Sequence, residues 1–138
     1  MSGWTELPRN WRGIRIDVRG KRDLAFNDWH RDNLPRWCYV TDVDFLEYRF
    51  KKGEIVLKAM LEIKEWHVVH PKYIEENANF KAVKKLCELS GLPLFVIWYK
   101  KDEKGNIVRF RLWNVFDEEK EDAREMASEE VRDFLEGL

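Results

Sequence analysis

Four stretches of the chain carry the residue pattern of β-strands: residues 37–50, 55–64, 94–99 and 107–115. Aromatic and β-branched residues dominate the first two, which are separated by the charged, glycine-containing sequence at residues 51–54. That arrangement predicts a β-hairpin. The third stretch is a continuous apolar run, which predicts a strand buried on both faces, and a turn at residues 101–106 leads into the fourth.

Three segments have the amphipathic pattern of helices: residues 22–33, 73–90 and 128–138. The first closes before Pro35, and Gly91 and Pro93 stop the second. Ser128, followed by two glutamates, predicts the capped start of the third. The apolar stripe of the second helix consists of Phe80, Val83, Leu86 and Cys87. An alternating segment at residues 13–18 predicts either a strand or an extended arm. The order is therefore helix, strands, helix, two strands and a terminal helix.

Composition limits the class of protein. With 138 residues, 44% of them hydrophobic and 14% aromatic, the chain is long enough for one domain with one core, and we expect residues 1–138 to form it. No apolar run approaches the ~20 residues that span a bilayer, and the amino terminus lacks the pattern of a signal peptide. We therefore expect a soluble, cytoplasmic protein with no membrane partner. Cys38 and Cys87 lack the spacing of a zinc or disulfide framework, which predicts reduced core thiols.

The charge is unevenly distributed along the chain. Residues 117–138 hold ten of the 26 acidic side chains but only three of the 25 basic ones, so the remainder holds 22 basic and 16 acidic side chains. A basic body with an acidic tail is compatible with nucleic-acid binding. Seven arginines and four tryptophans lie within residues 4–37 and could supply charge and stacking surface for a nucleic acid. A solvated charged face with buried aromatic side chains beneath it explains the same pattern equally well.

The candidate chemistry lies on the predicted hairpin. Because side chains alternate along a strand, Glu62 and Lys64 share one face about 7 Å apart. Asp44 lies on the neighbouring segment of the hairpin, so its carboxylate and that of Glu62 could share one divalent cation. Two carboxylates with waters and a phosphate oxygen suit Mg²⁺, and the main-chain carbonyl of Ile63 could add a ligand.

These residues, in this order of elements, resemble the PD-(D/E)xK nuclease superfamily. The resemblance covers roughly residues 22–115 and rests on Asp44 followed, after seventeen residues, by Glu62-Ile63-Lys64. It implies an α/β fold with a mixed central β-sheet flanked by helices, an αβββαβ core and here a C-terminal helix. It also implies that Asp44 and Glu62 bind Mg²⁺ or Mn²⁺ and that Lys64 orients or activates the attacking water.

The sequence departs from that family's pattern in three places. The proline before the aspartate is absent, Asp42 competes with Asp44 for the ligand position, and the first helix lacks the usual glutamate. His30 on that helix could contact the phosphate or a water, although a local structural role explains it as well. On the second helix the polar candidates that could face the site are Asn77, Asn79 and Lys81, of which Lys81 best suits a phosphate. A zinc site at His67 and His70 is rejected because no cysteine or acidic partner is close in sequence.

We therefore predict a metal-dependent DNA nuclease that hydrolyses phosphodiester bonds. Two alternatives remain: a non-catalytic nucleic-acid-binding or assembly module with the same fold, and a protein-binding domain that uses its acidic terminal helix and exposed tryptophans. A chain of this size has little surface with which to grip a duplex alone, which is compatible with a homodimer, although the sequence does not establish one.

Overall fold

The fold is a single five-stranded sheet with helices on both faces. A computed structural model describes residues 25–66, 74–117 and 124–138. In chain order the elements are α1 (Ala25–Asn33), β1 (Phe45–Lys51), β2 (Glu54–Glu65), α3 (Ala78–Ser90), β3 (Leu94–Lys101), β4 (Ile107–Asn114), β5 (Arg124–Met126) and α4 (Ser128–Glu136). None of the helices in the described ranges is long and apolar enough to cross a membrane.

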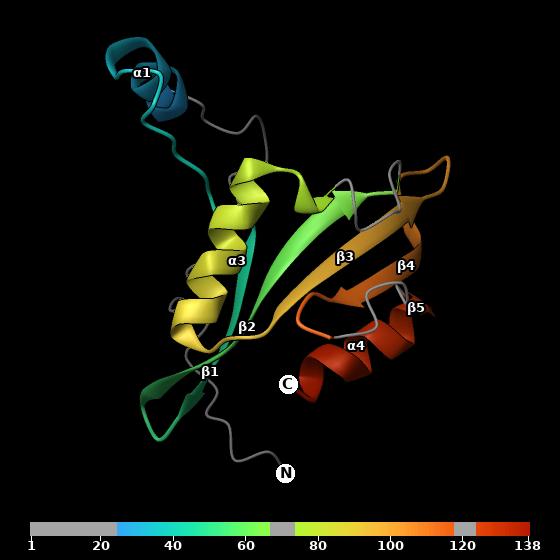
Figure 1. Cartoon of the computed structure of the whole chain (residues 1–138). Helices are drawn as coiled ribbons and strands as arrows, with labels where there is room; N and C mark the ends of the chain where they lie inside the picture. Colours follow the sequence, from blue (N-terminus) through green and yellow to red (C-terminus); the bar gives the residue numbers. More distant parts are fainter. Residues whose placement is uncertain (1–24, 67–73, 118–123) are drawn as a thin grey trace.

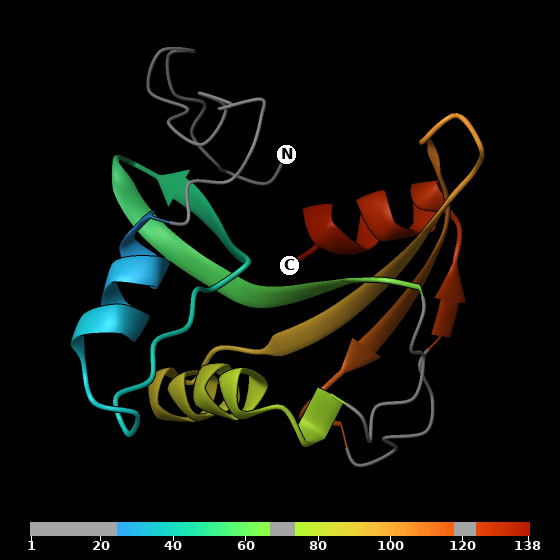
Figure 2. The same cartoon turned by 90° about the horizontal axis from the view of Figure 1, so that it is seen from above.

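The sheet is mixed and its strands follow one another in chain order. β2 and β3 are parallel, and every other neighbouring pair is antiparallel. Figures 1 and 2 show α3 on one face of the sheet and α4 on the other. The predicted α/β class, with a mixed sheet flanked by helices, is confirmed. Between α1 and α3 the described chain has two strands where the αβββαβ order has three, and the strand or arm predicted at residues 13–18 lies outside the described residues.

The hairpin forms as predicted, but its first strand is shorter. Lys52 and Gly53 have φ angles of 51° and 80°, as a two-residue type I′ turn requires. β1 begins at Phe45 rather than at residue 37, and the side chains of Trp37 and Tyr39 are 76% and 83% exposed. The prediction of a strand from residue 37 was wrong because aromatic content does not by itself indicate a buried strand face.

The core forms two layers because β3 is buried on both faces. Leu94, Val96 and Trp98 pack with α3 on one face, and Phe95 and Ile97 pack toward α4 on the other. Trp98 stacks at 6.5 Å on Trp113 of β4, and both side chains are fully buried. The apolar run at residues 94–99 therefore does what its pattern predicted.

Capping interactions define the ends of α3. The Asn77 side chain accepts hydrogen bonds from the main-chain N–H groups of Asn79 and Phe80, and Gly91 ends the helix with a φ of 74°. The helix thus begins at Ala78, later than predicted, because the capping asparagine fixes its first turn. Of the predicted stripe, Leu86 is 45% exposed, while the other three residues are buried.

The C-terminal segment contains a strand that the sequence pattern did not reveal. β5 (Arg124–Met126) pairs with β4 within the acidic tail, where no strand was predicted. α4 then begins with Ala127, not Ser128, at its cap position, and the Glu130 side chain accepts a hydrogen bond from the Ala127 N–H. Arg49 of β1 donates a 2.7 Å hydrogen bond to the carbonyl of Leu135, which ties the end of this helix to the opposite edge of the sheet.

Helix α1 stands apart from the sheet (Figure 1). Phe26 and Trp29 stack on one another with ring centroids 5.8 Å apart, and both remain exposed. Of the aromatic side chains near the amino end, Trp29 and Trp37 are therefore not buried beneath a charged face. Trp4, Trp11 and the arginines before residue 25 lie outside the described residues.

Candidate active site

The candidate site lies where the pairing of β1 with β2 ends. Phe45 is paired with Leu61, so the next pair in the same register would be Asp44 with Glu62. The Ile63 N–H instead donates a 2.9 Å hydrogen bond to the Asp44 carboxylate. Because this main-chain N–H is bonded to a side chain, the hydrogen-bonded pairing of β1 with β2 ends at Phe45. The Asp44 carboxylate is thereby held against β2.

Glu62 and Lys64 occupy the same face of β2, as their spacing predicted. The Lys64 Nζ lies 3.1 Å from a carboxylate oxygen of Glu62, and the two side chains are 42% and 12% exposed. Met60 precedes them on this face and belongs to the core under α3, and Val96, the partner of Glu62 on β3, is fully buried. The Glu62 side chain therefore lies at the edge of this apolar layer and is largely removed from solvent.

This environment changes the acidity of Glu62. Burial raises the pKa of its carboxyl group, the hydrogen bond from Lys64 opposes that shift, and the charge of Asp44 raises the pKa further. Desolvation and a second carboxylate both disfavour the ionised form. A site that holds two carboxylates together at this cost is a candidate functional site, because a bound cation would remove the repulsion.

The other predicted site residues are placed as follows. Asp42 is exposed and lies two residues before Asp44, in the connection that precedes β1, and the contact with Ile63 makes Asp44 the better ligand candidate. His30 lies on α1, away from the sheet, with its ring 6.2 Å from that of Phe26. Lys81 is exposed on α3, next to the helix turn that Asn77 caps. His67 and His70 lie outside the described residues. The structure therefore brings together four of the predicted residues: Asp44, Glu62, Ile63 and Lys64.

Two further residues on this face, Trp66 and Arg111, were not predicted from the sequence as part of the site. Lys64 pairs with Trp98 of β3, which pairs with Arg111 of β4, so a row across three strands carries two cations. The Arg111 guanidinium lies 5.2 Å from the ring centroid of Trp66, directly after β2. The alternation of Arg109, Phe110 and Arg111 was the available signal, but Trp66, on which the Arg111 guanidinium stacks, lies 45 residues earlier in the sequence.

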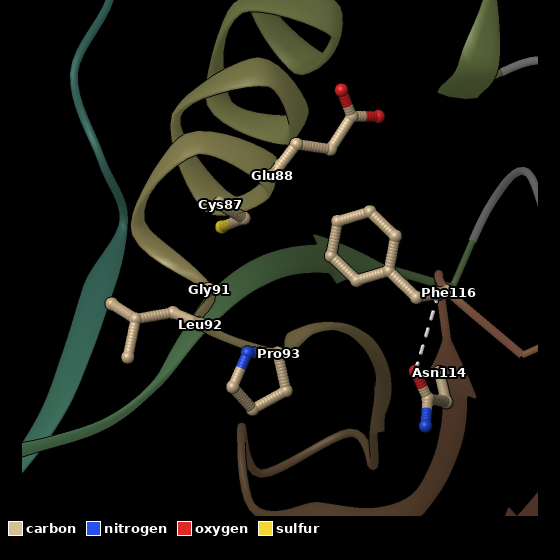
Figure 3. Close-up of a pocket in the computed structure, with 7 residues that line it drawn as sticks. All are labelled: Cys87, Glu88, Gly91, Leu92, Pro93, Asn114 and Phe116. Atoms are coloured by element: carbon tan, nitrogen blue, oxygen red, sulfur yellow. Dashed lines mark hydrogen bonds between the residues drawn. The ribbon is translucent and has the colours of Figure 1, made fainter.

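A concave region lies beside the amino end of β3, apart from the Asp44–Glu62 pair (Figure 3). It has a volume of about 430 Å³ and is lined by Cys87, Glu88, Gly91, Leu92, Pro93, Asn114 and Phe116. Burial raises the pKa of the Cys87 thiol, which makes it a poor nucleophile. The Asn114 side chain accepts a 3.2 Å hydrogen bond from the Phe116 N–H. Cys87 is thus a core thiol as predicted, whereas Cys38 is only half-buried. Neither Cys87 nor Asn114 makes this region a better candidate for the functional site than the Asp44–Glu62 pair.

Comparison with known proteins assigns no family. No protein-family model, curated protein or solved structure matches this chain. The geometry of the site and the resemblance in its motif therefore carry the functional argument.

The raised pKa of Glu62 predicts a pH-dependent effect of Glu62→Gln on stability in the presence of a chelator. The folded chain holds the Glu62 proton more tightly than the unfolded chain, in which the pKa is about 4.3. The contribution of the Glu62 carboxyl group to the free energy of unfolding is therefore fully present below the unfolded-state pKa. It is lost as the pH rises through the folded-state pKa. The variant should melt higher than wild type at pH 7.5, and the difference should shrink toward pH 4. Exposed Glu65→Gln is the matched control, and an equal or lower melting temperature for Glu62→Gln at pH 7.5 would contradict the assignment.

Proposed function

We propose that this protein is a metal-dependent DNA nuclease that hydrolyses phosphodiester bonds. The observation that carries the proposal is the Asp44 carboxylate bonded to the Ile63 N–H, beside a desolvated Glu62 that contacts Lys64. The resemblance of these residues to the PD-(D/E)xK nucleases supports the same function. The charge of the face supports it too, since Lys64 and Arg111 lie in one row where a phosphate backbone could bind.

The donor set fits a hard divalent cation. Mg²⁺ and Mn²⁺ prefer oxygen ligands, and Mg²⁺ usually keeps several waters, so one or two carboxylates suffice. Asp44 and Glu62 would hold the ion, and the Ile63 carbonyl is a further candidate ligand. Within the described residues no group of three or more His, Cys, Asp or Glu side chains is arranged to hold a metal ion, so the proposed Mg²⁺ would take its remaining ligands from main-chain oxygen and water. When bound, the ion would polarise a phosphoryl oxygen and lower the pKa of a coordinated water.

The chain's own residues would act by position and charge. Lys64 would stabilise the negative charge that develops on the phosphate, or orient the attacking water, from its place beside Glu62. The hydrogen bond from Ile63 would fix the Asp44 carboxylate, so that little reorganisation is needed when the substrate binds. The apolar surroundings of Glu62 would strengthen each of these electrostatic interactions.

Metal-dependent product release tests this function. Labelled single-stranded, duplex, flapped and branched DNA should each be incubated with the wild-type protein in Mg²⁺, Mn²⁺ or chelator. At least one substrate should be cut with either metal, and chelator should reduce the rate by at least about 100-fold. Salt-sensitive binding without any product in either metal would instead identify the non-catalytic nucleic-acid-binding module. Absence of both binding and product would favour the protein-binding domain.

Two asparagine variants decide which aspartate is the ligand. Asp44→Asn should lower the cleavage rate by about 100-fold or more, because it removes a carboxylate that neighbours Glu62. Asp42→Asn, two residues earlier and exposed, is the matched control and should keep the rate within a few-fold of wild type. The opposite ranking in single-turnover kinetics would transfer the ligand role to Asp42.

We also propose that the working form is a homodimer. The exposed aromatic side chains of α1 and of the connection that follows it supply apolar surface for a contact between copies: Phe26, Trp29, Trp37 and Tyr39. Light scattering at micromolar concentration should give about twice the mass of one chain. A single-chain mass across the whole concentration range would exclude the dimer.

A further inference from the structure

One face of the sheet separates negative from positive charge. Asp44 and Glu62 lie on the side of β1 and β2, and the exposed Lys100 and the half-buried Arg111 lie on β3 and β4. Neighbouring strands are about 4.8 Å apart, so the Cα atoms of Lys64 and Arg111, two strands apart, are separated by about 10 Å. One nucleic-acid strand, with a phosphate in every nucleotide, can span such a distance.

Arg111 is held in place without a carboxylate partner among the described residues. Its guanidinium stacks over Trp66 at 5.2 Å from the ring centroid, and its buried Nε has no hydrogen-bond partner. The carboxylate nearest in register is Glu125 on β5, but that side chain forms a 2.7 Å ion pair with Arg109 instead. Among the described residues no carboxylate pairs with this guanidinium, so an aromatic ring orients a cation that can accept an anionic ligand.

Lys100 extends the same positive area by one row. It pairs with Arg109 in the antiparallel register of β3 and β4, and its side chain is exposed. Arg109 is paired with Glu125 and Lys64 with Glu62, so among the described residues of these rows Lys100 and Arg111 are the cations without a carboxylate partner. The planar fork of arginine matches phosphate oxygens, and the lysine adds a flexible point charge.

We propose that Arg111 and Lys100 form a phosphate-binding subsite that holds the phosphodiester adjacent to the one that is cut. The inference rests on the proposed nuclease function, because the Asp44–Glu62 pair defines where the cut occurs. A DNA strand bound at this subsite crosses β2, β3 and β4 on the same face of the sheet as α3. Trp66 orients the Arg111 guanidinium and offers an edge against which the sugar or a base can pack.

A purely structural role for Arg111 makes a different prediction. If its guanidinium only covers Trp66, loss of the charge would change stability and leave DNA affinity and its salt dependence unchanged. If it binds a phosphate, the slope of log K against log salt concentration should become shallower, because one fewer counterion is released. The salt slope therefore separates the two roles.

The test uses the full chain with fluorescent single-stranded DNA, in chelator so that no cleavage occurs. Arg111→Met and Lys100→Met should each weaken binding several-fold at 100 mM salt and reduce the magnitude of the salt slope by about 0.7. Arg132→Met on α4, exposed and on the opposite face, is the matched control and should bind as wild type does. Lys100 is exposed and makes no packing contribution to the core, so its variant keeps the test decisive if Arg111→Met does not fold.

The outcomes separate this inference from the proposed function. Unchanged affinity and slope in both variants, with metal-dependent cleavage by wild type, would overturn the subsite and leave the nuclease assignment standing. Reduced affinity and slope in the variants, with no cleavage by wild type in any metal, would support the phosphate-binding subsite on a face without hydrolytic activity. Binding by Arg132→Met that is weakened as much as in the two variants would also overturn the subsite.

Discussion

The parallel pairing of β2 with β3 is the constraint on which the rest of the structure depends. It requires a crossover, which α3 provides, and it leaves β3 buried on both faces, between the two hydrophobic layers. The same pairing places Glu62 next to buried Val96 and Lys64 next to buried Trp98. The apolar surroundings that perturb Glu62 are thus a consequence of how the core is built.

The position of Glu62 beside Asp44 lowers the stability of the folded chain when both carboxylates are ionised. Glu62 is ionised only at a cost, since its carboxyl group is desolvated and faces the charge of Asp44. The ion pair with Lys64 offsets part of this cost. The Ile63 N–H donates a hydrogen bond to the neighbouring Asp44 carboxylate. The proposed cation would relieve the repulsion between the two carboxylates.

Local pattern predicted much of this molecule, and long-range register explains what it missed. The hairpin turn within residues 51–54, the apolar run of β3 and the shared face of Glu62 and Lys64 are local features, and each was predicted from the sequence. The start of β1 was not, because it is set by the side chain of Asp44 taking a main-chain donor from β2. β5 was missed because it is only three residues long and directly follows a strongly charged stretch. The stacking of Arg111 on Trp66 depends on the register of three strands, which no short motif encodes.

The most direct test of the central claim is calorimetric titration of Mn²⁺ into chelator-stripped protein. The claim is that Asp44 and Glu62 hold the cation while Lys64 acts on the substrate. Wild type and Lys64→Met should both bind Mn²⁺, and Glu62→Gln should bind at least about 10-fold more weakly, because a carboxylate ligand is lost. Binding of equal affinity by wild type and Glu62→Gln, or no binding by wild type, would contradict the account.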